Sequence, residues 1–186
     1  RPGLLALVGM LALPAASPAD LPEGLLTEIL TREQARDLSE GFLVETAGHS
    51  DAEVRTRALR AIGRMQDPAS VAAMETALED EDVAVRLEAA FALGQLFDEV
   101  AVPALLRGLE TQTDPAIRNM LVLGLGKCGT EETVPVLAGL LSREGVAPAA
   151  AEALGNLALK GIALDPVAAE LTTALRSPNP ELVWRA

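Results

Sequence analysis

The chain has 186 residues, of which 49% are hydrophobic but only 2% aromatic, and it contains no Tyr. This composition favours tightly packed helices over strands, because strands draw on aromatic and β-branched side chains. There are 15 Lys and Arg against 27 Asp and Glu, a formal net charge of −12. That balance argues against nucleic acid and anionic lipid as partners, because both are bound by clustered positive charge.

The start of the chain has the features of a secretory signal peptide. Arg1 precedes a short apolar run, and small residues follow as far as Ala19. The run is too short to cross a bilayer as a helix. We therefore expect residues 1–19 to be a signal peptide, the mature chain to have no membrane span and the protein to be exported. The alternative is a capping helix of the fold, which Pro14 and Pro18 would interrupt.

From residue 50 onward, a pattern of about thirty residues repeats. A copy opens with Asp, has Arg four positions later and Gly eight positions after the Arg. The recurring residues are Asp51, Arg55 and Gly63; Asp82, Arg86 and Gly94; Asp114, Arg118 and Gly126; and Gly155 in a fourth copy that has Ala147 in place of Arg. A fifth copy begins at residue 179, so we expect the last repeat to be truncated and the array to continue beyond Ala186.

Each copy reads as two helices. In the second copy, apolar residues from Val85 to Leu96 fall on one stripe of a helix, and those from Val102 to Leu109 fall on another after a polar turn. The leading Asp stands where an N-cap carboxylate accepts backbone amides. The recurring Gly lies inside the first helix, which predicts that a neighbouring backbone approaches closely there.

One helix pair cannot bury both its faces, whereas stacked pairs form a continuous core. The fold class we predict is therefore all-α: a right-handed α-solenoid of stacked antiparallel helix pairs. Residues 20–49 carry weaker apolar stripes and are expected to form a degenerate repeat that caps the array. Residues 50–186 form the array itself.

The repeated element D-x-x-V-R, followed by A-L-G and later by V-P-x-L, resembles the short HEAT-like repeats of the phycobilisome-lyase (PBS lyase) type. The resemblance covers residues 50–186 and implies a HEAT-like solenoid of the kind that serves as a binding surface. The family name allows a bilin lyase, and deoxyhypusine hydroxylase is a HEAT-like enzyme that holds a di-iron centre through His-Glu pairs. This sequence has one histidine, His49, and no such pair.

Other candidate chemistry is sparse. Cys128 is the single cysteine and lies in an apolar helical pattern, where a small buried thiol is expected. The acidic run 79–82 lacks the Gly and the alternating spacing of a calcium loop, so we interpret it as a solvated turn with one N-cap. The sequence accordingly predicts no catalytic residue, no cofactor and no metal.

The recurring arginines have two interpretations. Arg55, Arg86 and Arg118 could form a basic ladder that recognises an anionic partner. They could also pair with an Asp of their own or a neighbouring repeat, or with carbonyls at helix ends. Because each arginine recurs with the repeat and follows an Asp by four residues, the structural role is favoured.

Three functions fit the pattern. The first is an exported, non-catalytic scaffold that binds a protein or peptide on a concave face lined by the second helices. The partner-binding residues predicted for that face are Glu75, Glu79, Arg107, Glu110 and Arg143. The second is the helical arm of a larger exported enzyme, for example a cyclophilin-type prolyl isomerase, with its catalytic domain beyond residue 186. The third is a lyase or hydroxylase of the HEAT-like class, for which the catalytic residue types are missing.

Overall fold

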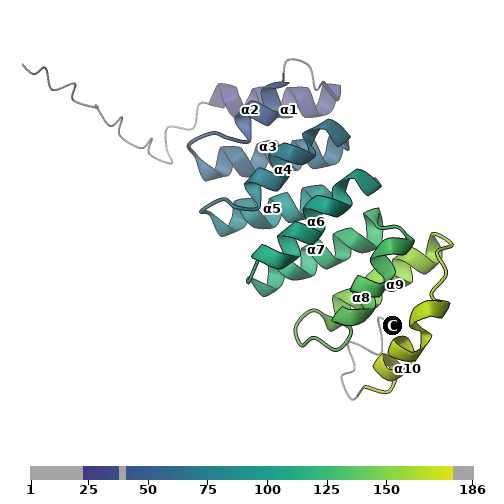
Figure 1. The fold of residues 1–186 in the computed structure, drawn as a ribbon. Coiled ribbons are helices and arrows are strands. Elements are labelled where there is room, and N and C mark those ends of the chain that lie inside the picture. The colour runs from purple at the N-terminus through teal and green to yellow at the C-terminus, as the bar shows by residue number, and fades with distance from the viewer. Residues whose placement is uncertain (1–22, 38–40, 178–186) are drawn as a thin grey trace, which may run out of the picture.

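The computed structural model describes residues 23–37 and 41–177, which form helices and turns without any strand (Figure 1). The α-helices of this part are α1 (Glu23–Ala35), α2 (Phe42–Thr46), α3 (Ala52–Met65), α4 (Val71–Ala77), α5 (Val83–Gly94), α6 (Val102–Thr111), α7 (Pro115–Cys128), α8 (Val134–Leu140), α9 (Ala147–Leu159) and α10 (Ala168–Leu175). The expected signal peptide, residues 1–19, and the fifth copy from residue 179 lie outside the described residues. Within the described part, no helix is both long and apolar enough to span a membrane.

The helices stack in two layers, as the predicted solenoid requires. The first helices of the repeats, α3, α5, α7 and α9, pack directly on one another, and each is followed by a shorter second helix, α4, α6, α8 or α10. Figure 1 shows the pairs in chain order from the top of the molecule to its lower right. Helices α1 and α2 both pack against α3 and close the N-terminal end of the stack. The predicted all-α solenoid is therefore confirmed.

The aspartate that opens each copy caps its helix. The Asp51 carboxylate accepts the Glu53 amide at 2.8 Å, and the Asp82 carboxylate accepts the Ala84 amide at 2.7 Å. Asp114 repeats the arrangement at the start of α7. Each cap satisfies backbone donors that have no partner inside the helix. Helix α9, whose copy lacks the Asp, begins without a side-chain cap.

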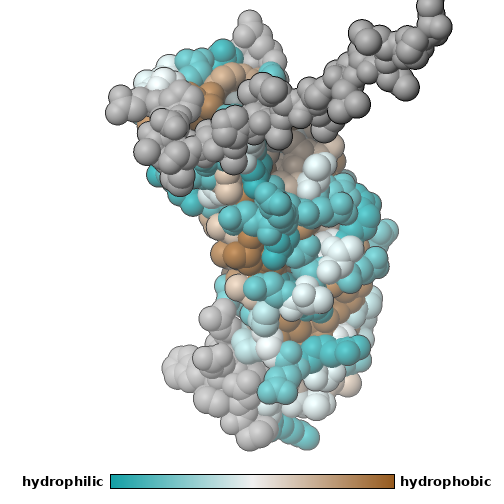
Figure 2. All heavy atoms as spheres, turned by 90° about the vertical axis from the view of Figure 1, so that its left-hand side faces the viewer, coloured by the Kyte–Doolittle hydropathy of each residue, from teal (hydrophilic) through white to brown (hydrophobic). Residues whose placement is uncertain are grey.

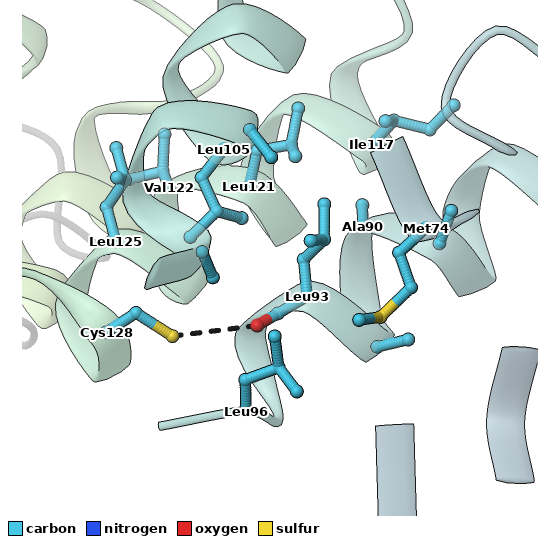
Figure 3. Packing of buried hydrophobic residues seen from close by; sticks show 14 of the residues in the cluster. Met74, Ala90, Leu93, Leu96, Leu105, Ile117, Leu121, Val122, Leu125 and Cys128 are labelled. Carbon is cyan, nitrogen blue, oxygen red and sulfur yellow. Dashed lines mark hydrogen bonds between the residues drawn. The ribbon is translucent and has the colours of Figure 1, made fainter. Parts of the chain in front are cut away.

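Aliphatic side chains from both layers form one continuous core. The stripe predicted for the second copy is buried, with Val85, Ala89, Ala92 and Leu96 in and just after α5. The equivalent residues of α3 are buried as well: Val54, Ala58, Ala61 and Met65. Figure 3 shows Leu93 of α5 with Leu105 of α6 and Leu121 of α7 on one side and Met74 of α4 on the other. Cys128 is buried in the same core, with its Sγ 3.6 Å from the Leu93 carbonyl oxygen. Burial raises the pKa of this thiol, which is the inert buried cysteine that the sequence predicts.

The recurring glycines lie where one first helix crosses the next. A Cβ added at Gly63 would lie 2.9 Å from the Cα of Ala92, and one at Gly126 would lie 2.5 Å from the Cα of Ala153. Gly94 faces a neighbouring backbone in the same way. Gly155 does not follow the prediction, because no described atom lies within 4 Å of its added Cβ. The described residues contain no further first helix to pack against it.

The stack bends toward its first helices. Because glycine and alanine let these helices approach closely, their layer is the more tightly spaced one, while the second helices contact one another only weakly. The second helices lie at the front of Figure 1 and therefore on the right in Figure 2. The outline of the molecule bulges on that side, whereas the left side is hollowed and shows hydrophobic residues. This corrects the expectation of a concave face lined by second helices. The inside of a bent stack is formed by the layer with the shorter spacing.

Candidate functional site

Arg55 is held inside the fold. Its Nε and Nη2 atoms each donate to a carboxylate oxygen of Asp80 at 2.7 Å. Its Nη1 atom donates to the carbonyl oxygens of His49 and Ser50 at 2.9 and 3.0 Å. The hydrogen bond to Asp80 raises the pKa of Arg55, although burial opposes it. The side chain therefore ties the start of α3 to the turn after α4.

Asp80 is the acidic partner of this ion pair. Burial opposes its ionisation, but the hydrogen bond from Arg55, the bond from the Asp82 amide and the charge of Arg55 together outweigh burial, so the pKa of Asp80 lies below its ordinary value. The side chains of Arg55 and Asp80 are only 9% and 13% exposed. The interpretation of run 79–82 as a solvated turn with one cap is therefore wrong at Asp80. The run therefore contains a carboxylate that holds the start of α3 against the turn after α4.

The other two arginines of the series bind backbone carbonyls instead. The Nη1 atom of Arg86 donates to the carbonyl oxygens of Asp80 and Glu81 at 2.7 and 3.0 Å. The Nη1 atom of Arg118 donates to those of Leu109 and Gln112 at 2.6 and 3.0 Å. Both arginines thus stabilise the turn that precedes their own helix, because they donate to carbonyl oxygens at the end of the preceding repeat.

No group of three or more His, Cys, Asp or Glu in the described part of the chain is placed to hold a metal ion. His49 lies between α2 and α3, where its Nδ1 atom accepts the Asp51 amide at 3.0 Å. Cys128 ends α7, two repeats further along. His49 therefore accepts a hydrogen bond in the turn that leads into α3, whereas Cys128 packs in the core.

The residues predicted to bind a partner fall into two groups on the outer layer. Glu75 of α4 and Arg107 of α6 form an ion pair, and the hydrogen bond from Arg107 lowers the pKa of Glu75. Glu79 and Glu110 line the same shallow groove, which has a volume of about 170 Å³. Arg143 lies apart from them in the exposed turn after α8. These residues form a mixed-charge surface on the bulging side of the stack.

A larger groove opens on the hollow side, between the first helices α3, α5 and α7. We call it the first-helix groove; its lining includes Arg60, Arg64, Leu87, Glu88, Phe91, Gln95 and Met120, and its volume is about 690 Å³. Leu87 and Phe91 follow one another along α5, and Met120 reaches the groove from α7. All three are only partly buried. The groove is thus an apolar floor that stays open to solvent.

Charged pairs flank this floor with their cations outward. Arg60 donates to both carboxylate oxygens of Glu88, at 3.1 and 2.7 Å, and its side chain is 41% exposed against 11% for Glu88. The hydrogen bond to Glu88 raises the pKa of Arg60. Arg64 donates to Glu33 at 2.6 Å, with 61% of its side chain exposed against 18%. In both pairs the guanidinium is the more exposed group, so a partner meets the cation before the carboxylate.

A lysine adds to this positive edge. The Nζ atom of Lys127 lies 5.8 Å from the ring centroid of Phe91 and 5.6 Å from that of Phe97. At these distances the ammonium is attracted by the negative faces of the two rings. The cation is therefore held beside the apolar floor.

The sequence contains a signal for the first-helix groove. Leu87 and Phe91 are apolar, yet they lie off the core stripe of their helix and so must face something other than the core. The recurring glycines predict that the first helices pack most tightly on one another, and the more tightly spaced layer is the inner layer of a bent stack. Together, these two features identify the hollow side and its apolar residues.

Comparisons with known proteins support the architecture. A family model described as HEAT repeats matches residues 40–121 and 102–186. A structure of the complex of CpcE and CpcF of phycocyanin lyase from Nostoc sp. PCC7120 matches with a TM-score of 0.60 and 21% identity over 98% of this chain and 78% of that one. An engineered protein matches with a TM-score of 0.55 and 22% identity, over 86% of this chain and 80% of its own.

Human deoxyhypusine hydroxylase in complex with glycerol matches with a TM-score of 0.43 and 20% identity, over 87% of this chain and 76% of that one. No curated protein sequence matches the chain. At such identities the two structures with TM-scores above 0.5 show the fold alone.

Proposed function

Because the chain belongs to the HEAT-repeat family, we propose that it is a non-catalytic scaffold that binds a protein or peptide partner in the first-helix groove. The observation that carries the proposal is the set of partly buried apolar side chains, Leu87, Phe91 and Met120, on the hollow side of the stack. Solenoids present extended concave surfaces to their partners. Apolar residues surrounded by polar ones, on such a surface, are typical of an interface.

The polar residues of the groove support recognition and give no sign of a reaction. Arg60 and Glu88 satisfy each other, and Cys128 is buried away from solvent. The groove lining contains no Ser, Thr, Cys or His, and its carboxylate, Glu88, is held by Arg60. Binding is therefore the role that these residues can perform.

Site-specific photocrosslinking tests the proposal. A photoreactive amino acid replaces Leu87 in one variant of the full chain and Val136, an exposed residue of α8, in a control. In an extract of the cells that make the protein, we expect a discrete crosslinked product from position 87 and none from position 136. A Phe91→Ala substitution in the first variant should abolish that product, because it removes the largest apolar side chain of the groove.

Direct binding completes the test. Once the crosslinked protein is identified and purified, isothermal titration calorimetry should show that it binds the unmodified chain and that Phe91→Ala weakens this binding. Crosslinks that arise only from position 136, or that persist unchanged in Phe91→Ala, would place the interface on another surface and overturn the proposal.

A further inference from the structure

We propose that the first-helix groove is specific for an acidic peptide segment in which carboxylates flank a large apolar side chain. This inference rests on the proposed function and adds the chemistry of the partner. It follows from the direction in which the ion pairs of the groove are oriented, from the apolar floor and from the contrast with the outer surface.

The ion pairs of the groove expose their cations, although the protein as a whole is acidic. The chain carries a formal net charge of −12, yet the groove places Arg60 and Arg64 above Glu88 and Glu33. About half of each arginine side chain is exposed to solvent, whereas the carboxylate that it binds is largely covered. A partner approaching the groove meets guanidinium groups first. A guanidinium has five N–H donors, and those that these pairs do not use can donate to an Asp or Glu carboxylate of the partner.

Lys127 extends the positive edge on the far side of the floor. Its ammonium lies against the rings of Phe91 and Phe97, and Arg60 and Arg64 lie on α3 across the groove. Carboxylates on both sides of an apolar residue in the partner would therefore each find a cation. This arrangement predicts that the partner has acidic residues on both sides of its apolar residue, and not a single one at one end.

The floor supplies the apolar part of the recognition. Leu87, Phe91 and Met120 line a space of about 690 Å³, which falls within the range of sites that enclose a small ligand and suits one or two large side chains. Met120 can adapt its shape to different apolar side chains, because its thioether side chain is unbranched and flexible. An anchor of the Leu, Phe or Trp type fits this floor.

A basic partner fits the groove less well than the outer surface. Long-range attraction by the net negative charge would bring a basic peptide to the protein, but in the groove it would face Arg60, Arg64 and Lys127. Like charges at an interface cost affinity and exclude wrong partners. The shallow groove around Glu79 and Glu110 on the outer layer would be its better site.

Selection from a random-peptide phage library tests the proposal without knowledge of the natural partner. The full chain is immobilised, and the enriched peptides are sequenced, synthesised and measured by fluorescence anisotropy. We expect them to share a Leu, Phe or Trp flanked by Asp or Glu, and to bind more weakly as salt is raised. Phe91→Ala should weaken binding roughly thirtyfold, as loss of an interface anchor does.

Two charge reversals provide a matched comparison. Arg64→Glu should weaken binding on the order of tenfold, because it replaces a cation of the groove by an anion. Arg107→Glu is the control on the outer layer, since it changes the net charge equally and also leaves a former partner, Glu75, beside a like charge. Arg107→Glu should leave the affinity unchanged, and circular dichroism should show that all variants are folded.

Three outcomes would overturn the inference: enriched peptides that are basic, enriched peptides without an apolar residue, and equal effects of the two charge reversals. A library that yields no enriched peptide would also count against it. None of these outcomes affects the crosslinking experiment, which reports where a partner binds irrespective of its charge. A crosslink from position 87 together with basic selected peptides would therefore leave the proposed function intact and reject the acidic partner.

Discussion

Arg55 and Asp80 show how one pair of side chains joins two parts of the array. The pair connects residues 25 positions apart, and the guanidinium also binds two carbonyl oxygens in the turn before α3. From the sequence, the arginine is visible as part of the repeat, whereas Asp80 is one of four consecutive acids. Only the folded path of the turn after α4 distinguishes it from the others, so periodicity could not predict this partner.

Replacing Asp80 should destabilise the protein strongly. We expect Asp80→Asn to lower the free energy of unfolding by about 3 kcal/mol at neutral pH, because it leaves the buried guanidinium of Arg55 without its counter-charge. Urea denaturation followed by circular dichroism measures the difference. Glu81→Gln changes the exposed neighbour and should stay within about 0.5 kcal/mol of the unmodified chain. Equal effects of the two substitutions would contradict the role assigned to Asp80.

The same pair gives the stability a dependence on pH. The pKa of Asp80 is lower in the folded chain than its unfolded value of about 3.9, so its contribution is complete above that value and is lost as the pH falls through the folded pKa. The difference in unfolding free energy between the unmodified chain and Asp80→Asn should therefore be constant near neutral pH and shrink below about pH 4. Urea titrations across this range provide the measurement. A difference that persists unchanged in acid would show that Asp80 does not gain stability from ionisation.

At the scale of helices, the sequence is a good guide because the relevant signals are local and repeated. The apolar stripe of α5 and the Asp82 cap follow from spacing within a single helix. The close approaches at Gly63 and Gly126 follow from the return of glycine inside a helix, where it is otherwise unfavourable. Gly155 differs because a close approach needs a second helix, and glycine alone does not supply one.

Two glycine substitutions test how the first helices pack. Gly126→Ala should destabilise the protein by about 1–3 kcal/mol, since its new Cβ would lie 2.5 Å from the Cα of Ala153 and α7 and α9 would have to separate. Gly155→Ala meets no described atom within 4 Å and should stabilise α9 by about 0.5–1 kcal/mol. Thermal and urea unfolding of both variants measure the two effects. A loss of similar size in both would mean that α9 is covered at Gly155.

At the scale of the whole molecule, the apolar periodicity of the sequence predicts a solenoid but leaves the direction of its bend undetermined. A repeat of two helices buries its core whichever layer lies inside, so apolar periodicity alone does not distinguish the two cases. The spacing of each layer decides it, and spacing depends on which helices carry small residues at their crossings. That is why Glu75 and Arg107 were expected on the concave face and lie on the outer one, while Leu87 and Phe91 lie in the hollow.

Because each repeat contacts only its neighbours, stability should vary along the stack. Helix α5 packs between α3 and α7 and contains six buried residues, whereas α10 contains one. Hydrogen exchange followed by mass spectrometry should therefore be slowest in α5 and α7 and fastest in α10. Asp80→Asn should speed exchange mainly from α3 to α5 and leave α9 nearly unchanged. Equal protection of α5 and α10, or a uniform response to the substitution, would show that the described helices unfold as one cooperative unit.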